Sequence, residues 1–255
     1  MNILVCIKQV PDLEAKFKIN EKGNWVVETD LAYRLNEYDE YAVEEAIRLK
    51  EKLGEGTANV TVLSIGPERV KEVIKKALAM GADRGIHIKD NEVYSKDSFR
   101  IASIINECVH SDNYDLIFTG MQSKDRGSCQ VGVFLGELLN VNTITTIVGF
   151  EYNNNEVTVK RELEGGKKMV VKCSLPLLLS CQLGLNTPRY PTLPNIMKAK
   201  RKELKEHDVK DFDKVSNNIE IIELTHPEKK GKAEILEGQI SDVSTKLVKI
   251  IKSKV

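Results

Sequence analysis

The feature that most constrains this fold is a regular alternation of short apolar runs with longer amphipathic stretches through the first half of the chain. In residues 39–53, for example, Ala42, Ala46 and Leu49 share one helical face, and Gly54 follows as a stop signal. Strands and helices alternating at this spacing predict a parallel sheet with right-handed crossovers, covered on both faces. The expected strands are 3–7, 60–65, 85–88 and 116–119, and the expected helices are 39–53, 70–78, 99–109 and 130–139.

The pattern changes near residue 150. Residues 150–163 and 167–173 alternate in the manner of antiparallel strands, with Gly165-Gly166 as a hairpin turn and 153–155 as another turn. The apolar run 175–181 then predicts a strand in the centre of the sheet. The expected fold class is therefore α/β: a doubly wound, mostly parallel sheet with an antiparallel hairpin addition and a C-terminal arm.

The last part of the chain is Pro-rich, then strongly charged, with helical periodicity only over 240–252. Such a segment with few aromatic residues has little with which to build a core of its own. We expect residues 1–187 to form the α/β domain and residues 188–255 to form a recognition loop and an arm that packs on a partner.

Composition excludes several classes of function. The 38 basic and 38 acidic side chains balance, which argues against non-specific nucleic-acid binding. No apolar run approaches the roughly 20 residues that span a bilayer, and the N-terminus lacks a basic leader, so we expect neither a membrane span nor a signal peptide. The cysteines show no CxxC spacing and predict reduced thiols in a cytoplasmic protein. A metal site is not expected, because only His110 has a nearby cysteine, Cys108.

Four polar loops stand where a doubly wound sheet binds its ligands, beyond the carboxyl ends of its strands. They are 6–8, 36–39, 64–66 and 120–132. The last, GMQSKDRGSCQVG, opens a predicted helix, whose free N–H groups and partial positive charge suit a phosphate. It is neither a Walker loop nor a GxGxxG fingerprint, and an ordinary polar βα loop with a serine cap is the alternative.

No catalytic constellation is evident. Lys8 and Asp39 have no histidine near them in sequence, and Cys6 and Cys129 fit small packing residues. Trp25 is expected to pack on a sheet edge. Any redox or transfer chemistry would then belong to a bound cofactor.

The segment 190–202, YPTLPNIMKAKRK, is predicted to be a recognition loop. Pro188, Pro191 and Pro194 prevent a regular helix or strand before Pro194 is passed. A stiffened segment with an apolar tip loses little entropy on docking, which suits protein recognition. A basic linker between domains is the alternative reading.

These features coincide with a resemblance that runs from Asn2 to about Lys205. The chain resembles the β subunit of electron-transfer flavoproteins in four strings: YAVEEAIRLKEK (41–52), ALAMGADRGIHI (77–88), VKRELEGG (159–166) and TLPNIMKAK (192–200). The resemblance implies an α-subunit partner that contributes most of the principal FAD site. It also implies electron transfer between acyl-CoA-type dehydrogenases and a further acceptor, with an adenine nucleotide bound in the 1–187 domain.

Carried over residue by residue, the resemblance implies two sets of functional residues. The backbone at 128–132 is expected to hold the phosphate, and Asp125 to fix the loop. Leu193 is expected to anchor the partner dehydrogenase. The implied cofactor-binding set is Cys6, Lys8, Asn36, Glu37, Tyr38, Asp39, Ile65, Gly120, Met121, Gln122, Ser123, Asp125, Arg126, Gly127, Ser128, Cys129, Gln130, Val131 and Gly132; the docking set is Pro191, Leu193, Pro194, Ile196 and Met197.

One departure leaves the nucleotide open. The family loop usually carries further acidic residues where this chain reads Arg126-Gly127-Ser128-Cys129. The added cation and the small serine favour more phosphate, and so a second FAD over AMP. The ending 130–132, Gln-Val-Gly, also resembles electron-bifurcating members, which exchange electrons with NAD(H). An unrelated nucleotide-binding or ATP-hydrolysing α/β protein is a further alternative, although Lys124 lacks the context of a phosphate-loop lysine.

Overall fold

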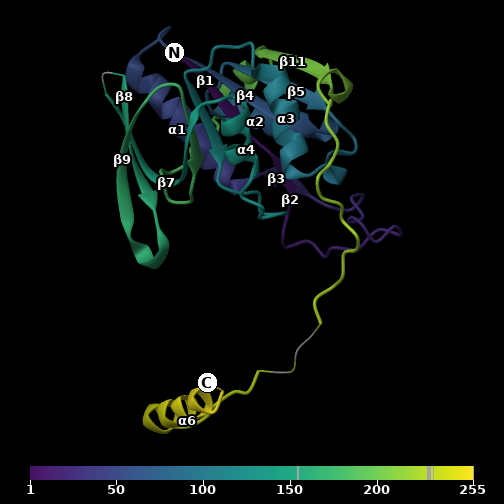
Figure 1. Ribbon diagram of the computed structural model, residues 1–255, viewed down its shortest axis with the longest axis vertical. Coiled ribbons are helices and arrows are strands. Elements are labelled where there is room, and N and C mark those ends of the chain that lie inside the picture. The colour runs from purple at the N-terminus through teal and green to yellow at the C-terminus, as the bar shows by residue number, and fades with distance from the viewer. Residues whose placement is uncertain (154, 229–230, 232, 255) are drawn as a thin grey trace. The chain divides into compact units, whose positions relative to one another are not determined.

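The computed structural model describes residues 1–153, 155–228, 231 and 233–254. The chain divides into two compact units, Met1–Glu223 and Leu224–Val255. The first unit is built on one nine-stranded sheet with helices on both faces, which confirms the expected α/β class (Figure 1).

The large sheet is parallel over most of its width and antiparallel at one side. Parallel pairing runs from β11 to β7, and β7, β8 and β9 then pair antiparallel. In spatial order the strands are β11 (Glu203–Asp208), β5 (Arg84–Lys89), β4 (Asn59–Gly66), β1 (Asn2–Cys6), β6 (Leu116–Gly120), β10 (Leu177–Cys181), β7 (Asn142–Asn153), β8 (Glu156–Glu162) and β9 (Lys168–Ser174). A separate antiparallel pair consists of β2 (Gln9–Pro11) and β3 (Tyr33–Leu35).

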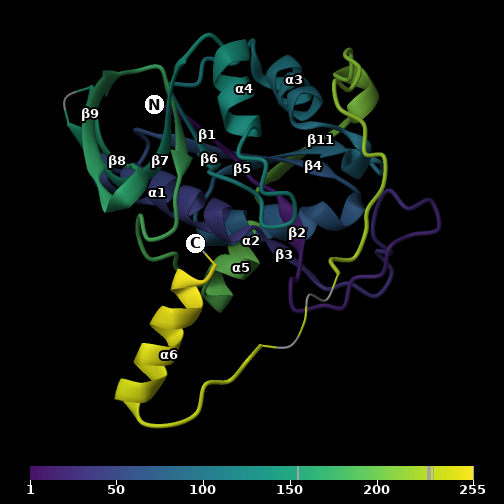
Figure 2. The same ribbon diagram turned by 60° about the horizontal axis from the view of Figure 1, so that its bottom comes forward.

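Two helical layers cover the sheet, as Figure 2 shows. One layer holds α1 (Glu37–Leu53), α2 (Lys71–Met80) and α5 (Leu193–Ala199), and the other holds α3 (Ser98–Val109) and α4 (Val131–Leu138). Ile3 and Phe118 point into the first apolar layer, whereas Leu4 and Ile117 point into the second. This alternation along each strand explains why the central strands are apolar on both faces. Short 3₁₀ turns occur at η1 (Glu68–Val70), η2 (Val93–Ser95), η3 (Glu164–Gly166) and η4 (Val209–Asp211).

The strand order reverses between β1 and β6. From β1 the chain passes through α1 to β4 and β5 on one side, and then crosses through α3 to β6 on the other side of β1. The helices that follow β1 and β6 lie on opposite faces of the sheet, so the two connecting loops diverge. Such a reversal opens a crevice at the carboxyl ends of the strands.

The antiparallel addition differs in detail from its prediction. The strand predicted to begin at Phe150 begins at Asn142, because the first residues of β7 pair in parallel with β10 before the strand turns to β8. Of the run 175–181, Leu177–Cys181 form strand β10 between β6 and β7, so the expected strand within the sheet is confirmed. Of the predicted turn at 153–155, Asn154 lies outside the described residues.

Residues 188–223, expected to form part of the arm, pack within the first unit. Helix α5 begins at Leu193, which corrects the prediction that no helix starts before Pro194 is passed; proline is tolerated in the first helical turn, where its missing N–H is not needed. Strand β11 was not foreseen, because its sequence ELKEHD reads as a charged tail. Charged side chains are typical of edge strands, and here only Leu204 and His207 are half-buried.

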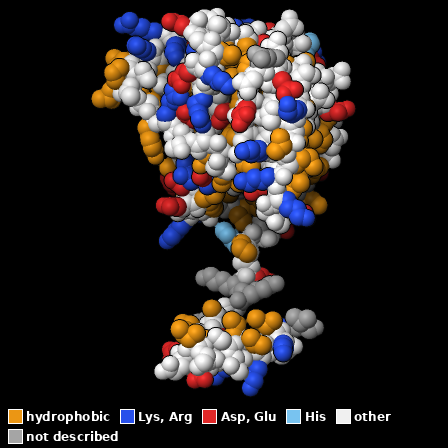
Figure 3. All heavy atoms as spheres, turned by 90° about the vertical axis from the view of Figure 1, so that its left-hand side faces the viewer, with side chains coloured by type: hydrophobic (Ala, Val, Ile, Leu, Met, Phe, Trp, Pro, Cys, Tyr) orange, Lys and Arg blue, Asp and Glu red, His pale blue; other side chains and the backbone are white. Residues whose placement is uncertain are grey.

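The second unit contains helix α6 (Ile240–Lys252), all of whose residues are described and none of which is buried. Its hydrophobic side chains gather on one side, visible in the lower group of atoms in Figure 3. They include Ile240, Leu247, Val248 and Ile251, each about half exposed or more. Among the described residues, no helix is long and apolar enough to cross a membrane.

Candidate nucleotide-binding site

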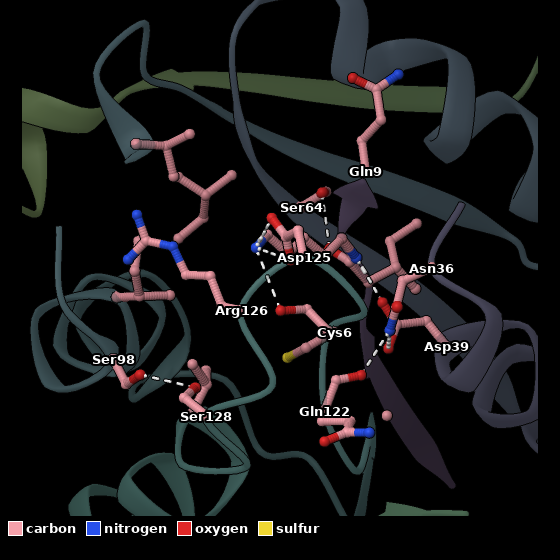
Figure 4. Close-up of a pocket in the computed structure, with 18 of the residues that line it drawn as sticks. Cys6, Gln9, Asn36, Asp39, Ser64, Ser98, Gln122, Asp125, Arg126 and Ser128 are labelled. Atoms are coloured by element: carbon pink, nitrogen blue, oxygen red, sulfur yellow. Dashed lines mark hydrogen bonds and ion pairs between the residues drawn. The ribbon is translucent and has the colours of Figure 1, made fainter. Parts of the chain in front are cut away.

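A pocket lies at the carboxyl ends of β1, β4 and β6, at the reversal of strand order (Figure 4). Its floor includes Cys6 and Ile65 at the ends of β1 and β4. One wall is the loop 120–132, and the opposite wall includes Trp25 and residues of 93–98.

Asn36 and Asp39 tie the loop after β1 to the loop after β6. The buried Asp39 carboxylate accepts hydrogen bonds from the backbone N–H of Lys8 at 2.7 Å and from Asn36 Nδ2 at 3.0 Å. Asn36 also donates to the carbonyl of Gln122 at 2.9 Å and accepts from the backbone N–H of Lys124 at 3.1 Å. The two loops that frame the crevice are therefore fixed to each other by side chains at the start of α1.

Burial around Asp39 has two consequences. Loss of hydration raises the pKa of Asp39 to about 7, against the hydrogen bonds from Asn36 and Lys8, which lower it. The carboxylate also packs against the end of β6, where a Cβ on Gly120 would lie 2.1 Å from Asp39 Oδ1. Position 120 therefore requires glycine because of the side chain beneath it.

Lys8 makes the second connection across the crevice. Its ammonium lies 2.7 Å and 2.6 Å from the two carboxylate oxygens of Asp125 and 3.3 Å from Ser123 Oγ. Burial lowers the pKa of Lys8, and the Asp125 carboxylate acts in the opposite direction. Asp125 thus contacts Lys8 in the loop after β1, and its role in fixing the loop 120–132 stays a prediction.

The end of the loop presents backbone donors to the pocket. Gly127 and Cys129 have φ angles of 61° and 57°, in the left-handed region. Such a backbone conformation is uncommon for a residue with a side chain, such as Cys129. Cys129, in the left-handed conformation, precedes Gln130, in the right-handed helical conformation. A left-handed residue next to a right-handed one turns successive backbone N–H groups to the same side of the chain. Among the described residues, no side chain caps α4, so its first N–H groups are free for a ligand.

Thr119 and Gly132 set the position of α4 against β6. A Cβ on Gly132 would lie 2.7 Å from Thr119 Oγ1. The glycine therefore allows the helix N-terminus to approach the strand end closely. Within the described part of the chain, the buried Thr119 Oγ1 has no hydrogen-bond partner. It lines the pocket, so a bound ligand could supply that partner.

Arg126 reaches from the loop 120–132 to the opposite wall, which includes Trp25. The Arg126 guanidinium donates to the carbonyl of Lys96 at 3.0 Å and to the carbonyl of Tyr94, and lies 5.0 Å from the centre of the Trp25 ring. Trp25 stacks on Tyr94 with ring centres 5.5 Å apart. The prediction that Trp25 packs on a sheet edge is therefore wrong. The aromatic pair and Arg126 close the pocket on the side away from Lys8.

Comparison with known proteins identifies the family of this chain. The sequence profile described as "Electron transfer flavoprotein domain" matches residues 24–212. The chain belongs to the electron transfer flavoprotein family. It is 38% identical to the electron transfer flavoprotein subunit beta of Bacillus subtilis, covering 100% of this chain and 98% of that protein. It is 34% identical to the same subunit of Methylophilus methylotrophus, with 98% of each chain covered, and 36% identical to the mitochondrial subunit of Arabidopsis thaliana, with 97% of each covered.

Membership of the electron transfer flavoprotein family implies association with flavin in general. The carried-over cofactor residues meet at one place. All of them line the pocket except Glu37, Tyr38 and Gly127. Tyr38 accepts a hydrogen bond from Gln122 at 2.8 Å and Glu37 pairs with Lys124, so these two residues brace the loop from α1.

Sequence reasoning missed the opposite wall of the pocket. It includes Gln9, Arg69, Tyr94, Asp97 and Ser98, together with Trp25. Ser98 faces Ser128 across the pocket mouth with 3.1 Å between the hydroxyl oxygens (Figure 4). These residues come from three separate connections, and no local spacing marks them as one surface. Ser98, which directly precedes the predicted helix 99–109, was the one available signal.

The expected docking residues lie on α5 and the residues before it. Leu193, at the first helical position, is 78% exposed, and Met197 and Ile196 are 60% and 41% exposed. Thr192 caps the helix by accepting a hydrogen bond from Asn195 N at 3.4 Å, which fixes its orientation. Arg189 anchors the segment on α1 through Glu44 and Glu51. The exposed apolar side chains thus lie on a short helix that is fixed to the rest of the domain. Their role in docking stays a prediction.

Proposed function

We propose that this chain is the nucleotide-binding β subunit of a heterodimeric electron-transfer flavoprotein that carries electrons between acyl-CoA-type dehydrogenases and a further acceptor. FAD, held mainly by the α subunit, supplies the redox chemistry. Full-length similarity to β subunits supports the proposal. The single structural observation that carries it is the uncapped N-terminus of α4, which faces a pocket at the reversal of strand order.

The residues present fit an adenine nucleotide. Phosphate oxygens accept hydrogen bonds, and the backbone from Ser128 to Gly132 offers donors at a helix N-terminus. Two buried side-chain oxygens that line the pocket, Gln9 Oε1 and Thr119 Oγ1, have no partner within the described residues. Gln9 Oε1 needs a donor, such as a ribose hydroxyl or an exocyclic amine.

The nucleotide is either AMP or a second FAD. Arg126 is already bound to two backbone carbonyls, which weakens the argument that it serves an additional phosphate. The stacked Trp25 and Tyr94 extend the pocket beyond the phosphate loop with an aromatic wall, which favours a larger, flat ligand such as a flavin. A second FAD here would make the chain a subunit of a bifurcating complex that exchanges electrons with NAD(H), and this is the second candidate function.

An ATP-hydrolysing role finds less support. A phosphate-loop lysine must reach the phosphates, whereas Lys124 pairs with Glu37 at the start of α1. Gly120 and Gly132 of the loop allow close approach to Asp39 and Thr119, respectively. We therefore retain the carrier and bifurcating alternatives.

Assembly is tested by co-expressing the chain with an α subunit. We expect a tight one-to-one heterodimer that contains flavin and accepts electrons from an acyl-CoA-type dehydrogenase. Because α6 and the residues around it leave apolar side chains uncovered, a chain ending at Glu223 is expected to bind the α subunit at least about tenfold more weakly. Equal affinity of the full and truncated chains would show that Leu224–Val255 does not contact the partner.

A further inference from the structure

A cluster on the far edge of the sheet combines one buried histidine with two carboxylates. His87 on β5 is fully buried, Glu206 on β11 is its direct neighbour in the parallel register, and Glu68 lies in η1. One ligand atom from each residue lies within 4.8 Å of the others. The three residues are far apart in sequence, which is why spacing predicted no metal site.

The histidine is oriented as a metal ligand would be. Its Nε2 lies 2.9 Å from the carbonyl oxygen of Gly66, and because a carbonyl only accepts, Nε2 carries the proton. In the neutral ring Nδ1 then keeps its lone pair. This atom is buried and, among the described residues, has no hydrogen-bond partner. Histidines that bind metals commonly donate their other ring N–H to a backbone carbonyl in this way.

We propose that His87 Nδ1, Glu68 and Glu206 form a binding site for a divalent first-row transition metal such as Zn²⁺. Imidazole and carboxylate ligands suit these ions, and three protein ligands leave one position for water. With bonds of about 2.0–2.1 Å, ligand atoms in a tetrahedral site lie about 3.4 Å apart, so modest rotations of the two exposed glutamates suffice. The bound ion joins β11 to β5 and η1 and so fastens the edge strand.

A lysine competes for the same carboxylates. The Lys71 ammonium contacts Glu68 and lies 2.8 Å from Glu206, and Lys89 lies 3.9 Å from Glu68. Metal binding must displace Lys71, whose charge therefore weakens the site. Lys71 is therefore a diagnostic position. If the cluster binds a metal ion, removing the Lys71 charge strengthens metal binding; if the cluster is only a salt-bridge network, the same change removes its central cation and creates no metal site.

The test titrates Co²⁺ into the metal-free full-length chain co-purified with its partner subunit, followed by visible absorption, with Zn²⁺ as competitor. We expect binding without thiolate bands, at least tenfold tighter in Lys71→Met and at least tenfold weaker in Glu206→Gln. Glu203→Gln on the same strand is the matched control and should bind as the unmodified protein does. His87 is left unchanged because it is buried in the sheet.

Two results would overturn the proposal. One is the absence of Co²⁺ binding in both the unmodified protein and Lys71→Met. The other is binding that persists undiminished in Glu206→Gln. Neither result bears on the nucleotide pocket, because Glu68, His87 and Glu206 do not line it.

Discussion

The Lys8 ammonium lies within 2.7 Å of both carboxylate oxygens of Asp125, although the two residues stand 117 positions apart in the chain. This contact joins the end of β1 to the loop after β6. It adds to the hydrogen bonds by which Asn36 already ties the same loop to the start of α1. We expect this charge pair at the base of the loop 120–132 to help hold the loop in place.

Asp125→Asn is expected to loosen the loop and lower nucleotide affinity at least about tenfold, which corresponds to about 1.4 kcal/mol. The loop would then have to be ordered on binding, and Lys8 would lose its partner. Calorimetric rebinding of the nucleotide to the stripped heterodimer measures this effect. Lys124→Gln is the matched control, because it removes a more exposed pair from the same loop and should change affinity by less than about threefold. Equal losses in the two variants would contradict the assigned role of Asp125.

Ser128→Glu should release the nucleotide by placing a negative charge among the backbone donors meant for phosphate. Ser128→Ala removes only the contact with Ser98 and should keep most of the affinity. Nucleotide content after purification distinguishes the two. Full occupancy in the glutamate variant would place the phosphate elsewhere.

A substitution at Gly132 acts differently. A side chain there meets Thr119 at 2.7 Å, inside the contact between α4 and β6. We expect Gly132→Ala to lower the melting temperature as well as nucleotide content, because the helix must shift. A nucleotide-free variant with an unchanged melting temperature would show that the contact with Thr119 is easily relaxed.

The raised pKa of Asp39 predicts that the stability of the folded chain depends on pH. Its pKa in the folded chain is raised from 3.8 to about 7, so the folded state binds the proton more tightly than the unfolded state. The resulting stabilisation is complete below pH 4 and is lost as the pH rises towards 7, at up to about 1.4 kcal/mol per pH unit. Melting temperatures of the unmodified protein and Asp39→Asn, compared between pH 4.5 and 7.5, measure this contribution. Identical pH profiles in the two proteins would contradict it.

Leu193→Ala tests the docking segment. A leucine side chain that fills a partner pocket contributes roughly 1.5–3 kcal/mol, and truncation of such an anchor commonly costs about 2 kcal/mol or more. We expect flavin reduction by the partner dehydrogenase, followed by stopped flow, to slow at least about tenfold. Reduction by a small chemical donor should stay normal. Neutralising Lys198, Lys200 and Arg201 should instead reduce the salt dependence of the rate, because exposed charges act mainly on encounter. An unchanged rate in Leu193→Ala would make the segment an ordinary connection.

The sequence predicted the parts of this fold that rest on local patterns. Apolar periodicity located β1, β4, β6 and the helices between them, and Gly120 marked the start of the loop 120–132. It did not reveal β11, whose charged edge position removes the apolar signal. Nor did it reveal the Trp25 wall of the pocket, because the stacking of Trp25 on Tyr94 depends on a contact between distant connections. The position of β11 and the position of Trp25 both depend on contacts between residues far apart in the chain, which residue type alone does not reveal.

The nucleotide content of the purified heterodimer tests the central proposal most directly. The complex is denatured, and released FAD and AMP are quantified by chromatography and mass spectrometry for the unmodified protein and Ser128→Glu. We predict one adenine nucleotide in this chain beside the FAD of the α subunit, either AMP or a second FAD, and its loss in Ser128→Glu with the other FAD retained. A single FAD with no further nucleotide, or a content that does not change in Ser128→Glu, would contradict the assignment of this pocket.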